Sequence, residues 1–430
     1  MRKLVLAACA MVAGASSAWA SDDTDPAEQS VARKDRGEQL AAERVAQTAK
    51  LDDNSTKRAS FEVATYADSD HVTVFTPSIA ASIENVVQGA SLRGRYIIDV
   101  VSAASADVVS TASPRWNEVR NAGSLEATYK PKTFGVTLAG SLSSEPDYFS
   151  FGLGSEMTLD LNEKNTTLEA GFGYGHDEVG RCGAENSPAA TVQTCTSFGV
   201  FSRVINRSSF NFGITQLLGA ATVGAIVADI GIENGDSSKP YRYVPMFAAD
   251  VAASAPLGAS YAWVTANRLP ERPLEQLPLS RNRLSVTGRL SHRFDGSTLK
   301  LEERVYGDNW ALFASTTDAR WIFDVGKRVG IWPHVRFHAQ TAVSFWQRAY
   351  VSGPAPGWDL PVFRTGDREL GPLWSGTGGG GMYLYVGSDA EPQKARFTVQ
   401  VDGMYTSFLD DLYLASRSGV LASLAFQVEL

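Results

Sequence analysis

Histidine and cysteine are scarce in this 430-residue chain, which has five histidines and three cysteines. Basic residues are also in the minority, since 39 lysines and arginines stand against 47 acidic residues and the formal net charge is −8. Such an acidic chain is unsuited to nucleic acid, which basic surfaces bind. No run of about 20 apolar residues occurs, so the sequence predicts no membrane-spanning helix. The 44% of hydrophobic residues is too high for a disordered protein.

The first twenty residues, 1–20, have the layout of a secretory signal peptide. Arg2 and Lys3 form a basic start, residues 4–14 form an apolar core, and residues 18–20 read small-x-small. We expect cleavage after Ala20, which removes two positive charges and takes the formal net charge from −8 to −10. The sequence therefore predicts an exported, acidic protein.

Residues 21–57 differ from the rest of the chain, because they are rich in charge and alanine and contain no aromatic residue. Their apolar face is weak, so we expect a disordered arm or a short helix in the periplasm. Such a leader is either simply solvated or a contact site for a periplasmic partner.

Export would leave Cys182 and Cys195 in a compartment that permits disulfides. The residues between them, 183–194, are rich in Gly, Asn, Ser and Pro. A disulfide would close this single loop and stabilise the fold by roughly 3 kcal/mol. The alternative is a metal site, but two thiols without a nearby histidine or acidic cluster do not complete one.

Beyond the leader, over residues 58–430, apolar and polar side chains alternate. Residues 333–345 show the pattern, with one apolar face (Val335, Phe337, Val343) and one polar face (His334, Arg336, His338, Gln340). Residues 283–293 and 396–405 repeat it. Alternation with period two predicts β-strands that have an apolar side and a wet side.

Roughly 16 to 18 such segments follow one another between residues 60 and 430. Short turn-forming stretches separate some of them: 68–70, 162–165, 206–208 and 294–297. Longer connections separate others: 102–118, 179–196, 269–282 and 349–374. Short turns at one end and long loops at the other are typical of an outer-membrane barrel.

A soluble β-sandwich would alternate in the same way, but one face of each strand would then pack a dry core. The polar faces here carry too much charge for that, whereas the inside of a membrane barrel can be polar. We therefore predict an all-β fold, a transmembrane antiparallel up-and-down β-barrel of about 16–18 strands. Aromatic residues near strand ends fit its interfacial girdles: Tyr66, Tyr148, Phe149, Trp310, Trp321, Trp332, Trp374 and Tyr405.

Several short runs carry a resemblance to a known family: residues 98–105 (IDVVSAAS), 113–120 (SPRWNEVR), 147–154 (DYFSFGLG), 304–310 (RVYGDNW), 240–242 and 270–273. In these runs the chain resembles a family of Gram-negative outer-membrane β-barrel proteins catalogued as a domain of unknown function. The resemblance implies fold and compartment rather than chemistry. In size and layout the chain is also similar to barrel porins that serve polysaccharide secretion pathways.

Catalytic motifs are missing from the sequence, and we predict no catalytic residues, no enzyme activity and no cofactor. His334 and His338 have a spacing that pairs metal ligands only on a helix. On a strand Arg336 stands between them and opposes a cation, so we predict lumen lining and no metal site. The glycine-rich run 376–381 lacks the lysine and helix of a phosphate loop, so we expect close packing or a strand bend there.

The polar strand faces predict a lumen lined by charge of both signs. The candidates are Arg283, Arg289, Arg293, Lys300, Glu302, Arg304, His334, Arg336, His338, Gln340, Arg396 and Asp402. Such a lining either selects a solute by charge or packs the lumen with ion pairs. Residues 352–371, rich in proline and glycine, are the candidate for a constriction or a surface cap.

We predict a channel for a hydrophilic cargo, and the favoured cargo is polysaccharide that is exported across the outer membrane. The alternatives are a plugged structural or adhesin-like barrel and a small-solute diffusion porin. The expected partners are outer-membrane lipid and lipopolysaccharide, the barrel-assembly machinery and, for polymer export, a periplasmic export protein. No nucleic acid is expected.

Overall fold

The computed structural model describes residues 55–103, 116–145, 148–180, 201–239, 242–270, 273–353, 359–387 and 393–430. The predicted signal peptide, the leader up to residue 54, Cys182 and Cys195 lie outside these residues, and so does the proposed disulfide. The first strand begins at Ser55, so the last three residues of the predicted leader belong to the barrel.

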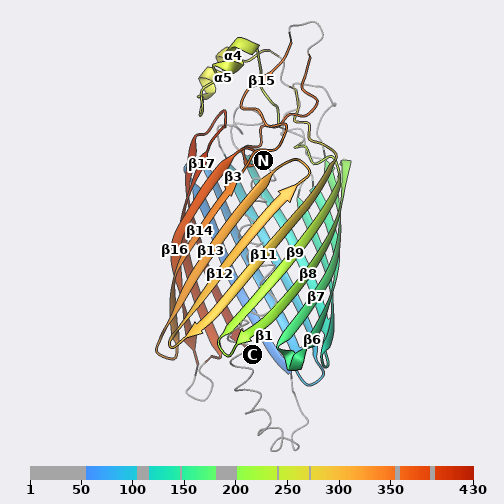
Figure 1. The fold of residues 1–430 in the computed structure, drawn as a ribbon, viewed down its shortest axis with the longest axis vertical. Helices are drawn as coiled ribbons and strands as arrows, with labels where there is room; N and C mark the ends of the chain where they lie inside the picture. Colours follow the sequence, from blue (N-terminus) through green and yellow to red (C-terminus); the bar gives the residue numbers. More distant parts are fainter. Residues whose placement is uncertain are drawn as a thin grey trace, which may run out of the picture.

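Sixteen strands of the described chain form one closed antiparallel barrel (Figure 1). Each strand pairs with the next in the chain, and β1 pairs with β18 to close the ring. The strands are β1 (Ser55–Asp68), β2 (Val72–Asn85), β3 (Ala90–Ala103), β4 (Trp116–Tyr129), β5 (Phe134–Glu145), β6 (Tyr148–Leu161), β7 (Thr166–Gly180), β8 (Phe201–Gly219), β9 (Thr222–Gly235), β11 (Ser280–Phe294), β12 (Ser297–Asp308), β13 (Phe313–Val325), β14 (Val329–Gln340), β16 (Leu373–Val386), β17 (Ala395–Phe408) and β18 (Ser416–Glu429). The predicted fold class is confirmed.

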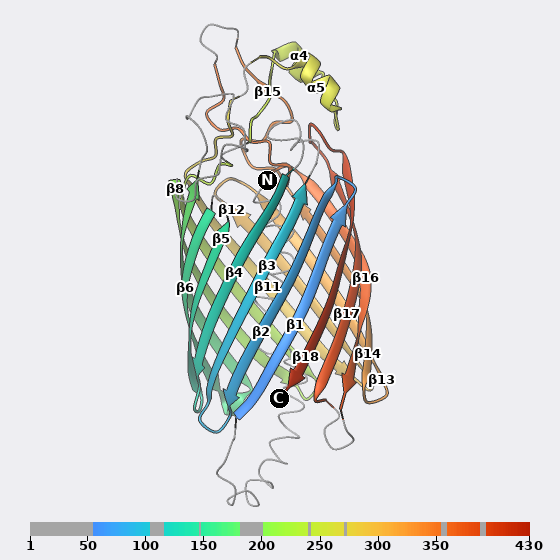
Figure 2. The same cartoon turned by 180° about the vertical axis from the view of Figure 1, so that it is seen from behind.

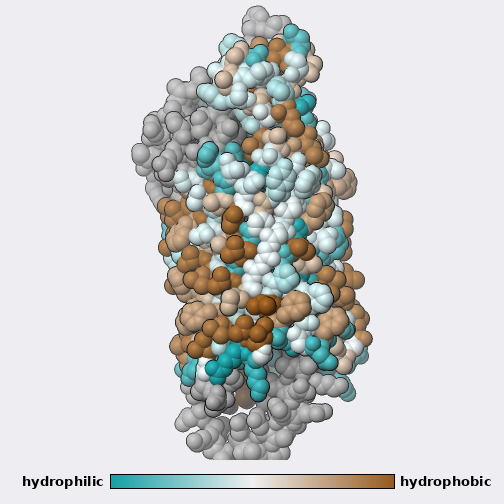
Figure 3. All heavy atoms as spheres, turned by 90° about the vertical axis from the view of Figure 1, so that its left-hand side faces the viewer, coloured by the Kyte–Doolittle hydropathy of each residue, from teal (hydrophilic) through white to brown (hydrophobic). Residues whose placement is uncertain are grey.

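The alternation in the sequence separates the two faces of the barrel wall. On β17, Val399 and Val401 are 40% and 48% exposed on the outside, whereas Asp402 is only 2% exposed on the inside. Figure 3 shows the outer wall with large brown apolar areas and a teal, hydrophilic lower edge. This apolar outer surface is what a barrel needs to contact lipid, because lipid cannot hydrogen-bond to polar groups.

Short turns gather at the end of the barrel where β1 begins and β18 ends (Figures 1 and 2). The segments between strands there include 86–89, 130–133, 162–165 (with the 3-10 turn η1, Asn162–Lys164), 220–221, 295–296 and 326–328. The longest described connections, 236–279 and 341–372, stand at the other end. One predicted turn, 68–70, lies among these longer loops.

The prediction of a turn at residues 206–208 is wrong, because these residues lie inside β8. Asn206 and Ser208 pair in register with His176 and Tyr174 of β7, and Arg207 forms an ion pair with Asp177. The strand ladder on both sides therefore overrides the local turn preference of Asn and Ser.

The predicted aromatic girdle is correct only in part. Trp321 and Tyr405 are exposed on the outer wall (44% and 43%). Tyr66, Trp310 and Trp332 are 7%, 3% and 6% exposed, because Tyr66 bonds to Asp68, Trp310 packs under the loops and Trp332 lies beneath Arg320. Val343, expected on the lipid face, is likewise buried under the loops (3%).

The long loops fold into a cap over one end of the barrel (Figure 1). The cap contains the two-stranded sheet of β10 (Met246–Phe247) and β15 (Tyr350–Val351), the helices α4 (Ala249–Ala253) and α5 (Tyr261–Asn267), and the 3-10 turn η3 (Arg368–Leu370). Three apolar clusters pack it, and one of them joins Phe247 and Val264 to Leu412 of the β17–β18 loop. Neither α4 nor α5, nor any other helix of the described residues, is long and apolar enough to span a membrane.

Candidate functional site

The interior face of the barrel carries the charged side chains expected to line it. Each of the three predicted arginines of β11 pairs with a carboxylate of another strand: Arg283 with Glu233 of β9 (3.1 Å), Arg289 with Glu302 of β12 (2.8 Å) and Arg293 with Asp324 of β13, one strand further on. Because each guanidinium already has a carboxylate partner on the barrel wall, these charges largely neutralise one another there.

Two other predicted residues, Arg304 and Arg336, have no carboxylate in an ion pair with them among the described residues. Arg304 is exposed, and its Nη2 donates only to the hydroxyl of Ser285 at 3.1 Å. Arg336 stands on the same face of β14 as His334, and Lys300 pairs in register with Arg320 of β13. Arg304, Arg320 and Arg336 therefore place positive charge on the lumen side of β12, β13 and β14.

His334 lies between two carboxylates. Its Nδ1 is 2.9 Å from Asp402 and its Nε2 is 3.0 Å from Asp318. His338, by contrast, lies 2.7 Å from the hydroxyl of Thr316. The two histidines thus have separate partners, and no group of three His, Cys, Asp or Glu side chains in the described chain is placed to hold a metal ion.

Gln340, the last residue of β14, lies at the capped end of the barrel, and Arg396, near the start of β17, lies at the end with the short turns. Gln340 donates from Nε2 to the carbonyls of Glu369 and Gly371 in the cap, both at 2.8 Å. Arg396 donates to Thr398 at 3.1 Å and its guanidinium lies 5.4 Å from the centre of the Tyr383 ring. On β16 between them, Gly379, Gly380 and Gly381 are closely packed, since a Cβ on any of these would come within 2.4 Å of a neighbouring atom, whereas a Cβ on Gly378 would meet none within 4 Å.

Three carboxylates that sequence reasoning missed face the lumen from the other side of the barrel. They are Glu126 of β4, Glu156 of β6 and Glu169 of β7, which interact electrostatically with each other or with nearby charged residues. None of the three forms an ion pair within 4.0 Å among the described residues. The interior positions around them are small: Ala139, Gly154, Gly171, Ser209 and Gly213. Because these interior residues are small, apolar and polar side chains alternate only weakly along these strands. The sequence pattern therefore did not single out the three glutamates.

The acidic and basic surfaces face one another across the barrel. Seven strands separate β4 from β13 in either direction around the ring, so these two strands lie opposite. Glu126, Glu156 and Glu169 lie on β4 to β7, whereas Arg304, Arg320 and Arg336 lie on β12 to β14. We call these the acidic wall and the basic wall. Their opposition creates an electric field across the lumen, at right angles to the direction of passage.

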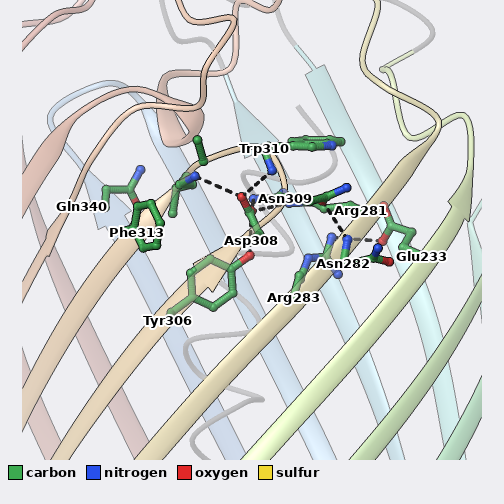
Figure 4. A network of polar contacts seen from close by, with 12 residues as sticks. Glu233, Arg281, Asn282, Arg283, Tyr306, Asp308, Asn309, Trp310, Phe313 and Gln340 are labelled. Carbon is green, nitrogen blue, oxygen red and sulfur yellow. Dashed lines mark hydrogen bonds and ion pairs between the residues drawn. The ribbon is translucent and has the colours of Figure 1, made fainter.

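A network near the capped end fixes the top of β11 and β12 (Figure 4). Asp308, whose side chain is fully buried, accepts hydrogen bonds from Arg281 Nε at 2.7 Å and from the Tyr306 hydroxyl at 2.9 Å. Its other oxygen accepts from the backbone N–H groups of Trp310 and Leu312, both at 3.0 Å. One carboxylate therefore shapes the turn from β12 to β13 and ties it to β11.

Residues 364–370 of the cap form a strap across the mouth. On one side, Asp367 contacts Arg242 Nη1 at 2.9 Å and Lys239 Nζ at 3.4 Å, in the loop that joins β9 to β11. On the other side, Arg368 pairs with Asp70 of the β1–β2 turn. Seven strands separate β1 from β9 either way, so two consecutive residues link opposite sides of the ring and must pass over the lumen.

The charges of the strap are buried, with Arg242, Asp367, Arg368 and Asp70 between 3% and 6% exposed. Although burial alone opposes ionisation, the charges of Arg242 and Lys239 hold the pKa of Asp367 well below its usual range. Burial, together with the charge of Arg242, lowers the pKa of Lys239. The strap is thus fastened by ionic contacts that solvent reaches poorly, and such contacts are costly to break one at a time.

A family model described as "Protein of unknown function (DUF3570)" matches residues 1–394. No curated protein sequence matches significantly. Among solved structures, a bacterial polysaccharide outer membrane secretin gives a TM-score of 0.44 at 6% identity, over 86% of this chain and 98% of that one.

Two further solved barrels are similar. The siderophore receptor PirA from Acinetobacter baumannii gives a TM-score of 0.42 at 9% identity over 84% of this chain, which spans about half of that receptor (54%). The outer membrane protein OpdK from Pseudomonas aeruginosa gives 0.40 at 7% identity, over 89% of this chain and 100% of that one. These likenesses concern the fold and say nothing of a cargo.

Proposed function

The chain belongs to the family described as protein of unknown function (DUF3570), and from the charged residues of its lumen we propose that the protein is an outer-membrane channel for a charged hydrophilic cargo. The observation that carries the proposal is the opposition of the acidic wall and the basic wall inside one closed barrel. Charged groups with few partners of their own are available to a solute, and opposed signs orient one that carries charge.

Within this proposal the favoured cargo is a polysaccharide that is exported across the outer membrane. Tyr383 and Tyr385 lie on the interior face of β16, 5.0 Å apart between ring centres, beside Arg396. Aromatic rings bind the apolar faces of sugars, and arginines and carboxylates bind their hydroxyl and acidic groups. A small-solute diffusion porin would need the charged walls but not the aromatic pair.

The role of the walls is tested by ion selectivity in planar bilayers. Replacing Glu126, Glu156 and Glu169 by Gln together should shift the reversal potential in a salt gradient toward anions, because the basic wall then dominates. Glu163→Gln, in the short turn after β6, is the matched control and should leave selectivity unchanged. Unaltered selectivity in the triple variant, with conductance preserved, would contradict the role of the acidic wall.

The cargo is tested in cells. Deleting the gene should abolish surface polysaccharide while leaving uptake of small solutes intact, and a plasmid copy should restore the polymer. Loss of small-solute uptake with polymer retained would indicate the diffusion porin instead.

The proposed compartment and processing have their own readouts. We expect the chain in the outer-membrane fraction, with heat-modifiable mobility in gels, in contact with lipid, lipopolysaccharide and the assembly machinery. Intact-mass measurement should show a mature chain that starts at Ser21. A periplasmic export protein would bind at the short-turn end if the cargo is a polymer.

A plugged structural or adhesin-like barrel is the second candidate, and the strap favours it. A closed cap with an apolar core and buried ion pairs presents a rigid outer surface and obstructs the mouth. Conductance separates the two functions, because a permanently plugged barrel shows no discrete current steps.

A further inference from the structure

The leader, residues 21–54, has no role yet in the proposed channel. Its first ten residues, 21–30, carry four acidic side chains and no basic one: Asp22, Asp23, Asp25 and Glu28. The remaining residues, 31–54, carry five acidic and five basic side chains. The negative charge of the leader is therefore concentrated in one anionic segment, residues 21–30.

The inner faces of β12, β13, β14 and β17 are positively charged on balance. They carry five basic side chains: Lys300, Arg304, Arg320, Arg336 and Arg396. Three of their acidic side chains pair with arginines of β11: Glu302, Asp308 and Asp324. The other two, Asp318 and Asp402, both contact His334. Five basic side chains against these last two leave this side of the lumen positive even when His334 is neutral, and a positive wall attracts an anionic segment.

The leader joins the barrel at the end that the cap leaves open. β1 begins at Ser55 at the short-turn end (Figure 2), whereas the strap crosses the other end. Arg304 and Arg336 each lie seven residues into their strands from the short-turn end, a depth of roughly 18 Å for tilted strands. Glu28 stands 27 residues before Ser55, and a chain of that length reaches at most about 90 Å. The anionic segment is thus long enough on its tether to reach the basic wall.

We propose that residues 21–30 bind the basic wall from the short-turn end and occupy the lumen until an anionic cargo displaces them. This inference rests on the channel proposed above and assigns its resting state. A segment tethered to the barrel has an effective concentration on the order of millimolar in the lumen for a short linker. A weak contact between opposite charges is therefore enough to fill the site, and a cargo of the same charge sign competes for the same arginines.

Cysteine cross-linking of the full-length chain in native outer membranes tests the contact. Thr24→Cys, within the anionic segment, is combined with Thr377→Cys, which lies directly opposite Arg336 in the ladder. The matched control combines Thr24→Cys with Ala139→Cys, which lies directly opposite Glu126 on the acidic wall. Both pairs are made with Cys182→Ser and Cys195→Ser. Under mild oxidation the peptide linked through positions 24 and 377 should exceed the peptide linked through 24 and 139 at least about fivefold by mass spectrometry.

The role of the acidic side chains is tested in the same cross-linking pair. Neutralising all four acids of the anionic segment should lower the link to position 377 to the level of the control, and so should 1 M salt in place of about 0.1 M, because salt screens the attraction. The matched variant neutralises four acids nearer to β1 and should keep the link: Glu38→Gln, Glu43→Gln, Asp52→Asn and Asp53→Asn. Equal links to both walls, links to a different protein only, or a link to position 377 that survives neutralisation of residues 21–30 would overturn the proposal.

Single-channel recording separates this proposal from the channel itself. The chain neutralised in residues 21–30 should stay open at least about three times as long as the wild type, because the lumen is no longer occupied at rest. Equal open times, with currents present in both proteins, would overturn the occupied resting state. Absence of current from every variant would contradict the channel, while the cross-links would still show which wall the leader contacts.

Discussion

At the scale of single residues, Asp308 holds the capped end of the barrel together. Its carboxylate binds Arg281, Tyr306 and two backbone N–H groups, with none of its side chain exposed. Asp308→Ala should lower the free energy of unfolding in urea by about 3 kcal/mol, because Arg281 is then buried without its partner. Asp295→Ala, in the short turn at the other end, is the control. A loss below about 0.5 kcal/mol for Asp308→Ala, the level of an ordinary surface change, would contradict this role.

Residue roles were the part of the site that the sequence predicted least well. Alternation placed Arg283, Arg289 and Arg293 on one strand face, but the partner of each depends on which strands become neighbours and in what register. Glu126 and Glu169 escaped notice because glycine and alanine surround them on the interior face. A side chain's charge is visible in the sequence, whereas its pairing is a property of the closed ring.

At the scale of elements, the strap crosses the mouth of the barrel. Asp70→Asn together with Arg368→Gln removes the pair that fastens it to the β1–β2 turn without leaving one charge buried alone. The single-channel conductance of this double variant should rise relative to the wild type, because the strap can then leave the mouth. Arg348→Gln, whose partner Asp410 is half exposed, is the control. An unchanged conductance would mean that the strap does not obstruct passage.

The strap should also stay fastened in mild acid. The pKa of Asp367 is held below its usual range by Arg242 and Lys239, so its ionised form stabilises the folded cap. That contribution is complete above the ordinary carboxylate pKa of about 3.9 and is lost only as pH falls through the lowered value. Conductance between pH 8 and pH 5 should therefore be constant. A transition near pH 6 would contradict this assignment.

Elements were predicted well where lipid dictates the pattern and poorly where packing does. The strands β11, β14 and β17 were visible because one face must be apolar and the other can be wet. The cap was expected only as a surface cap or constriction within residues 352–371. Its two short helices and its buried pairs were not foreseen, since α4 and α5 have five and seven residues and no period marks so short a segment.

At the scale of the whole molecule, the acidic composition has a spatial meaning. Glutamates and arginines that form no ion pairs with each other lie on opposite walls of one lumen, Glu126, Glu156 and Glu169 on one and Arg304, Arg320 and Arg336 on the other. The sequence predicted the barrel and its strand number to within two. It predicted a loop at 349–374, close to the connection 341–372, but only the end (269–282) of the connection 236–279. It could not predict the opposition of the walls, because that follows from closing sixteen strands into a ring.

Single-channel recording in planar bilayers tests the central claim most directly. The purified wild-type chain should give discrete current steps, and the Asp70→Asn, Arg368→Gln variant should give larger ones from the same folded barrel. Silence of both proteins, with heat-modifiable mobility showing that both are folded, would contradict the channel and leave the plugged barrel.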